Sequence, residues 1–209
     1  MRPLLGLVLL MIITITATSV SAGCAGSLPA NHRKAVGSNR VDYATFSATV
    51  RYYVNVERCR RSLSPLLADP NLLKAAIAHS QFMAKANNMT HTSSVRGQRT
   101  LRDRMHTFSV NQRVAAENIA QNFVYSLVGR SISISMRGPC QFTYADTGQP
   151  VPQHSYASLA QHQVANWMAS SKHHANLMNR RFTRMETAYG FAPDQATCGR
   201  VYLAQDFAG

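Results

Sequence analysis

The chain has 209 residues and a basic composition, with 22 Lys and Arg against 9 Asp and Glu and a formal net charge of +13. This length fits one domain with a sizeable core after an N-terminal segment is set aside. The sequence contains no nucleic-acid-binding motif, Gly-rich phosphate loop, GxSxG or HExxH, so a nucleic-acid partner and the common catalytic classes are not indicated. The plain interpretation of the charge is a solvated basic surface, and the alternative is contact with an anionic envelope surface.

Residues 1–22 are typical of a secretory signal peptide. Arg2 precedes the apolar run LLGLVLLMIITIT, and small residues follow as far as Ala22. The run is too short to predict a transmembrane helix, and no later stretch of the chain approaches a membrane-spanning length. We therefore expect export to the periplasm or the cell exterior.

Two processing sites compete at the end of this segment. Cleavage after Ala22 would release a soluble protein. The alternative is a lipobox ending at Cys24, which would then carry a lipid anchor, although Ser21 stands where Leu is usual. Residues 23–40 are small, polar and basic, and predict a flexible tether to a domain over residues 41–209.

The first half of this domain predicts helices. A helical pattern covers residues 41–63, and a second helix begins at Asp69-Pro70, with Asp as N-cap and Pro in the first turn, and ends near residue 87. Its apolar stripe includes His79, which is interpreted as a satisfied core histidine. A polar loop over 89–98 follows, and then short helical or irregular pieces as far as residue 120.

The second half predicts strands around one long helix. The sequences SISISM and QFTY flank Gly138-Pro139 and predict a hairpin within the segment 123–155. A helix is expected over 156–169, and strands near 187–192 and 200–207. Helices followed by strands indicate an α+β domain rather than alternating βαβ units.

Three polar residues are candidates for chemistry, namely His91, Glu117 and His173. Glu117 is one of only three glutamates in the chain and lies in an apolar Ala/Ile segment. Two imidazoles and a carboxylate suffice to bind a divalent metal such as zinc with one open position, or for acid–base catalysis near neutral pH. Ser170 precedes His173 at helical spacing and could act as a nucleophile beside that base. The structural alternative is that Glu117 fixes a loop by accepting hydrogen bonds.

The four cysteines fit an oxidising compartment and match no metal-binding spacing. Cys59 lies on the same apolar helical stripe as Tyr52, Val56 and Leu63, and is interpreted as a small buried residue. Cys140 and Cys198 are therefore the expected disulfide, and a lipid on Cys24 would leave one thiol unpaired.

In their order along the chain, these motifs resemble the bacterial branch of the CAP superfamily, the cysteine-rich secretory, antigen 5 and pathogenesis-related proteins. The motifs are Asn55-x-x-Arg58, Leu63-x-Pro65-Leu66, Leu72-x-x-x-Ala76-x-x-His79-Ser80-x-x-Met83, His91, Glu117-Asn118-Ile119-Ala120, Trp167-x-x-Ser170-x-x-His173 and Tyr202-x-x-Gln205-x-Phe207. The resemblance covers the chain from about residue 45 onward. It implies an α-β-α sandwich with a central antiparallel sheet flanked by helices.

The resemblance also implies a cleft lined by His91, Glu117 and His173, which match three of the four positions of the family's His-Glu-Glu-His tetrad. Ser170 stands where many members have the second Glu, and the segment 123–155 is additional to the family's core pattern. We expect a binding module for a lipid, a peptide or a divalent metal rather than an enzyme. The alternative is a metal-assisted hydrolase or peptidase with Glu117 as general base.

Overall fold

The computed structural model describes residues 21–37, 40–134 and 140–209. The apolar run of the expected signal peptide and the tip of the expected hairpin lie outside these residues. Within the described ranges, no helix combines the length and the apolar character that a membrane span requires.

Two long helices precede the sheet. Helix α2 covers Tyr43–Cys59 and is capped by Asp42, whose carboxylate accepts the backbone N–H of Thr45. It ends four residues earlier than predicted, because Ser62 adopts a left-handed conformation that turns the chain away. Helix α3 covers Pro70–Ala86 and begins at the predicted Asp69 cap.

The central sheet contains three antiparallel strands in the order β1-β5-β4. Their ranges are Ala115–Phe123 for β1, Arg184–Ala192 for β4 and Arg200–Ala208 for β5. The segment around Glu117 was expected to be helical or irregular, and it is a strand instead. It pairs with β5 along its whole length, and helices cover both faces of the sheet, so its sequence lacks the alternation of a half-exposed strand.

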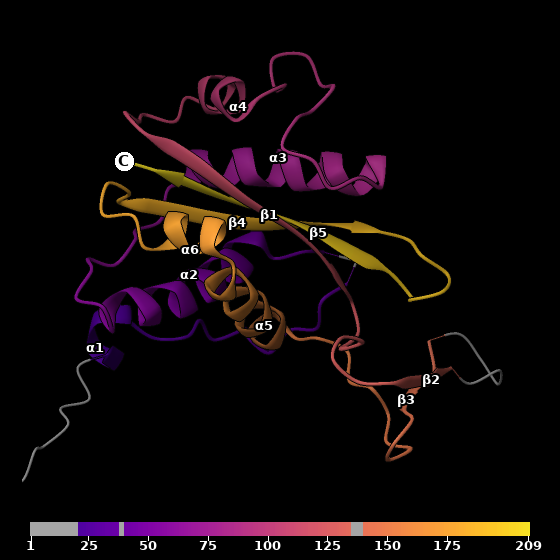
Figure 1. Ribbon diagram of the computed structural model, residues 1–209. Coiled ribbons are helices and arrows are strands. Elements are labelled where there is room, and N and C mark those ends of the chain that lie inside the picture. Colours follow the sequence, from indigo (N-terminus) through magenta and orange to yellow (C-terminus); the bar gives the residue numbers. More distant parts are fainter. Residues whose placement is uncertain (1–20, 38–39, 135–139) are drawn as a thin grey trace, which may run out of the picture.

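Helices lie on both faces of this sheet (Figure 1), and the α-β-α sandwich is confirmed. Helices α3 and α4 (Leu101–Thr107) pack on one face, while α2, α5 (Tyr156–Ala169) and α6 (Ser171–Leu177) lie on the other. The larger core cluster lies on the α2–α5 side and contains the buried Trp167. On the opposite face α3 approaches β4 closely at Gly190, where an added Cβ would lie 2.2 Å from the carbonyl oxygen of Ser80.

The predicted hairpin is present as β2 (Ile132–Ile134) paired with β3 (Phe142–Tyr144), and it projects from the body of the domain (Figure 1). The expected disulfide between Cys140 and Cys198 is confirmed, and it fastens the hairpin to the turn before β5.

The N-terminal lead-in differs from the expected flexible tether. Residues 23–37 are docked against the domain, where Val36 is fully buried and its N–H donates to the carbonyl of His154 at 2.8 Å. Cys24, in helix α1 (Ser21–Ala25), forms a disulfide with Cys59, which corrects the interpretation of Cys59 as a simple buried residue. A lipid thioether on Cys24 would exclude this bond, since both need the same sulfur.

The second disulfide generates a testable prediction. Replacing Cys24 and Cys59 together by serine should lower the free energy of unfolding by about 2–4 kcal/mol, because the bond closes a long loop in the unfolded chain. Denaturant unfolding of the two proteins measures the difference. Peptide mapping of the mature wild-type protein should find the two cysteines linked, and an acyl group on Cys24 would contradict the assignment.

Candidate functional site

Glu117 lies at the centre of a buried charge network on the α3 face of the sheet. The Nδ1–H of His91 donates to its Oε1 at 2.8 Å, and Nη2 of Arg104 donates to its Oε2 at 2.5 Å. Nε2 of His79 lies 3.6 Å from the same Oε2. The four side chains come from α3, the loop after it, α4 and β1, so the network ties four elements together.

Local structure explains why these side chains meet. The helical stripe of α3 places His79 over the sheet, and its Nε2–H donates to the carbonyl of Thr90 at 2.8 Å. The next residue in the loop is His91. Thr100 and Asp103 form a reciprocal capping box that starts α4, and the following residue, Arg104, is fully buried.

The protonation states in the network follow from burial and charge. Burial alone would raise the pKa of Glu117, but the hydrogen bond from His91 and the charge of Arg104 outweigh it and lower the pKa. The hydrogen bond to Glu117 raises the pKa of His91, while burial lowers the pKa of His79. Glu117 is therefore a carboxylate at neutral pH, His79 is neutral, and the partly exposed His91 is the titratable member.

A second carboxyl group lies beside Glu117 and was not identified from the sequence. Asp206 on β5 is directly opposite Glu117 in the sheet register, is fully buried, and has no hydrogen-bond partner for either oxygen among the described residues. Burial and the nearby charge of Glu117 raise its pKa well above the ordinary value. Asp206 is therefore a neutral acid beside the Glu117 carboxylate. Its only sequence signal is an acidic residue within a strand whose two faces are both buried.

His173 approaches this network from the opposite side of β1. It lies in α6, where its backbone carbonyl accepts a hydrogen bond from Nδ2 of Asn118 at 3.4 Å. Burial, and then the charge of His91, lower the pKa of His173. Ser170 caps α6 without a side-chain hydrogen bond to the helix. No hydrogen bond joins Ser170 to an imidazole among the described residues.

The expected metal site was tested against this geometry. In the described ranges no group of three or more His, Cys, Asp and Glu side chains is arranged to hold a metal ion. Both oxygens of Glu117 already accept hydrogen bonds, and the fully buried Arg104 places a positive charge against the carboxylate, which disfavours a cation there. These contacts do not fit a metal held by His91, His173 and Glu117 together. The network agrees better with the other interpretation of Glu117, in which its carboxylate fixes a loop by accepting hydrogen bonds.

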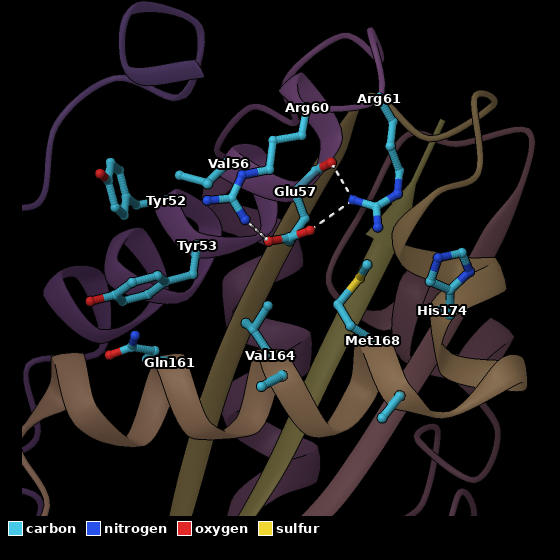
Figure 2. Close-up of a pocket in the computed structure, with 12 residues that line it drawn as sticks. Tyr52, Tyr53, Val56, Glu57, Arg60, Arg61, Gln161, Val164, Met168 and His174 are labelled. Atoms are coloured by element: carbon cyan, nitrogen blue, oxygen red, sulfur yellow. Dashed lines mark hydrogen bonds and ion pairs between the residues drawn. The ribbon is translucent and has the colours of Figure 1, made fainter. Parts of the chain in front are cut away.

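A groove lies between α2 and α5, on the opposite face of the sheet from the Glu117 network (Figure 2). Its volume is about 710 Å³, which falls in the range of small-molecule sites, about 300–1,000 Å³. The lining residues are Tyr52, Tyr53, Val56, Glu57, Arg60, Arg61, Gln161, Val164, Ala165, Met168, Ala169 and His174. This groove has no signal in the sequence, since it is built by the packing of two helices that are distant along the chain.

The buried ion pair predicts a large effect of a small substitution. Glu117→Gln should lower the free energy of unfolding by about 3–5 kcal/mol, because it leaves the buried Arg104 without a counter-charge. Glu57→Gln is the matched control, since Glu57 pairs with two exposed arginines, and a loss of at most about 1 kcal/mol is expected there. Equal effects in denaturant unfolding would contradict the buried pair.

His91 and His173 should titrate in a fixed order. In an NMR pH titration, His91 should lose its proton at a higher pH than His173, because Glu117 raises the pKa of the first and burial lowers that of the second. The stability from the His91–Glu117 pair is then present below the ordinary imidazole pKa and is lost as the pH rises through the folded value. His91→Gln, which removes this group, should abolish that loss, and a reversed order would disprove the assignment.

Comparisons with known proteins agree with this fold. The chain is 29% identical over 135 residues to the uncharacterized protein YkwD of Bacillus subtilis (strain 168). The aligned residues make up 65% of this chain and 38% of YkwD. An extracellular protein containing a SCP domain from Bacillus anthracis str. Ames superposes with a TM-score of 0.52 at 22% identity, over 79% of this chain and 41% of that one. An outer surface protein from Borrelia burgdorferi also gives 0.52, at 13% identity, over 83% of this chain and 100% of that one.

The chain therefore spans well under half of the first two relatives and the whole of the third. The two structural matches lie below 25% identity and show the fold. The family itself is shown by the sequence, since residues 51–207 match the model of the cysteine-rich secretory protein family, CAP. The chain belongs to the CAP family.

Proposed function

We propose that the protein is an exported CAP-domain binding module whose groove between α2 and α5 holds a single-chain amphiphile with an anionic head group, such as a fatty acid. Export is supported by the signal-like N-terminus and by two disulfides. Two structural relatives are named as an extracellular and an outer surface protein. The apolar groove with two arginines in its lining is the observation that carries the proposal.

The floor of the groove suits an alkyl chain. Val164, Ala165 and Met168 of α5 face Val56 of α2 across it. These side chains offer apolar surface with no polar atom except the methionine sulfur, so burying methylene groups against them is favourable. Gln161 lies at the same end as the tyrosines (Figure 2).

The two ends of the groove differ in charge (Figure 2). Tyr52 and Tyr53 lie at one end, with their rings 5.3 Å apart in an edge-to-face arrangement. Arg61 lies toward the other end, and the guanidinium group of Arg60 lies nearer the middle. Both pair with Glu57, Arg60 at 2.6 Å and Arg61 at 2.7 Å. One carboxylate shared by two guanidinium groups leaves a net positive charge, so an anionic head group near the arginines is favoured.

The alternative of a metal-assisted hydrolase has less support. A general base needs a carboxylate oxygen that can take a proton near neutral pH. Both oxygens of Glu117 accept hydrogen bonds, and its pKa is lowered. A role of His91, Glu117, Ser170 and His173 in catalysis or in metal binding stays a prediction from the sequence.

Binding of dodecanoate, measured by calorimetry, tests the groove. Ala165→Trp fills the floor and should weaken binding by at least about tenfold, equivalent to ~1.4 kcal/mol. Asn166→Trp adds the same side chain at an exposed neighbouring position outside the groove, and should leave affinity within about twofold. Equal affinity of all three proteins would exclude this groove as the site.

The charged end is tested with a neutral ligand. Replacing Arg60 and Arg61 by glutamine should weaken dodecanoate but leave dodecanol unchanged, since only the carboxylate needs the guanidinium groups. The same change at the exposed Arg180 and Arg181, which do not line the groove, is the control. A loss of dodecanoate binding in the control pair would show that general surface charge is responsible instead.

A further inference from the structure

The loop between α3 and α4 forms a second hollow, on the opposite side of the sheet from the groove. Its volume is about 670 Å³. The lining includes the ring of Phe82, the hydroxyl groups of Thr90, Thr92 and Ser94, and the guanidinium-bearing Arg96 and Arg99, and it contains no carboxylate. We call this hollow the loop site.

The loop site is held in shape by its own hydrogen bonds. Ser93 N–H donates to the carbonyl of Arg99 at 2.8 Å, which closes the loop. Gly97 allows the turn through a positive φ of 76°, and its carbonyl accepts the hydroxyl of Thr107 at 2.6 Å. A loop fixed in this way loses little conformational entropy when a ligand binds.

The buried charge network reaches the same loop. Nη1 of Arg104 lies 3.4 Å from the carbonyl oxygens of both His91 and Gln98. These two residues flank the loop segment that lines much of the hollow. Arg104 itself is held by Glu117. The family's cleft glutamate therefore fixes the backbone that carries the hydroxyl groups and the two arginines.

The two arginines of the loop site are not held in ion pairs among the described residues, although Arg99 interacts electrostatically with Asp103. Arg96 and Arg99 are both exposed. This differs from the groove, where Glu57 partly neutralises the cations. Guanidinium groups bind carboxylate and phosphate oxygens in bidentate geometry, so the loop site favours an oxyanion.

The remaining lining indicates what carries that oxyanion. The ring of Phe82 packs nearly parallel to the buried His79, with centroids 6.1 Å apart, which fixes its orientation. The hydroxyl groups of Thr90 and Thr92 are 3.1 Å apart at the surface. An aromatic face beside hydroxyl donors and acceptors complements a sugar ring, which has both apolar C–H groups and hydroxyl groups.

We propose that the loop site binds an anionic glycan, meaning a chain of sugars that bear carboxylate or phosphate groups. Phe82 supports one sugar ring, the loop hydroxyl groups bind its hydroxyl groups, and Arg96 and Arg99 bind its oxyanion. The site is separate from the α2–α5 groove and would attach the protein to an anionic polymer while the groove stays open.

Calorimetry at fixed salt, with short probes, tests the proposal. Tetragalacturonate supplies carboxylates, maltotetraose phosphorylated at carbon 6 supplies phosphates, and plain maltotetraose is the neutral counterpart. Arg96→Gln with Arg99→Gln should weaken both anionic probes by at least about tenfold, ~1.4 kcal/mol. Binding of only one anionic probe would identify the oxyanion. Binding of maltotetraose as tightly as the anionic probes would overturn the proposal.

The control must distinguish binding at this site from nonspecific attraction by the net charge of +13. Arg102→Gln with Arg113→Gln removes the same charge from exposed positions outside the hollow, and should change affinity by less than about twofold. An equal loss in the control pair would mean diffuse electrostatic binding and would overturn the proposal. Dodecanoate binding should be unchanged in Arg96→Gln with Arg99→Gln, so failure here and failure of the groove are distinguishable.

The role of the aromatic ring is tested separately. Phe82→Leu should weaken the anionic oligosaccharides but leave tripolyphosphate, which has no sugar, unaffected. Tripolyphosphate that binds the wild type as tightly as the oligosaccharides would show that the sugar ring makes no contribution. Amide shifts over residues 90–99 in an NMR titration should report the binding directly, and shifts confined to other segments would also overturn the assignment.

Discussion

The ion pair between Glu117 and Arg104 is the constraint on which the α3 face of the domain depends. Both side chains are buried, so each would carry a large desolvation penalty without the other. Their hydrogen bonds extend to His91 and to two loop carbonyls, which gives both carboxylate oxygens and both terminal guanidinium nitrogens a partner. Because the pair joins a strand, a short helix and a loop, none of these elements can shift without exposing an uncompensated buried charge.

The same constraint explains why Asp206 must be neutral. It lies opposite both Glu117 and Glu186 in the sheet register, so three carboxyl groups form one row across the sheet. Arg104 and Arg51 supply counter-charges to the two outer members, and the fully buried Asp206 lies between them without a cation of its own. Burial and the neighbouring charge of Glu117 both oppose its ionisation. The row therefore holds a proton next to Glu117, in a place shielded from solvent.

The parts of the fold that the sequence predicted are those with a local signal. The Asp69 cap and the apolar stripe of α3 depend on residues within a few turns of one another, and both are confirmed. The strand containing Glu117 was misassigned because burial on both faces removes the alternation that marks a strand. Arg104, Asp206 and the Cys24–Cys59 bond were not identified, since each acquires its partner only through tertiary packing. For the candidate site, the family resemblance located His91 and Glu117, but not the arginine that determines what Glu117 can do.

The arginines show how one residue type serves two purposes in this basic chain. Arg58 and Arg104 are fully buried, and their guanidinium groups are bound to carbonyl oxygens or to a carboxylate of the domain. Arg96 and Arg99 are exposed on a loop whose backbone those internal contacts fix. Net charge alone does not separate the two groups, although only the second is free to attract an anion. The positive charge available for binding is thus smaller than +13 suggests, because buried arginines such as Arg58 and Arg104 are already bound within the domain.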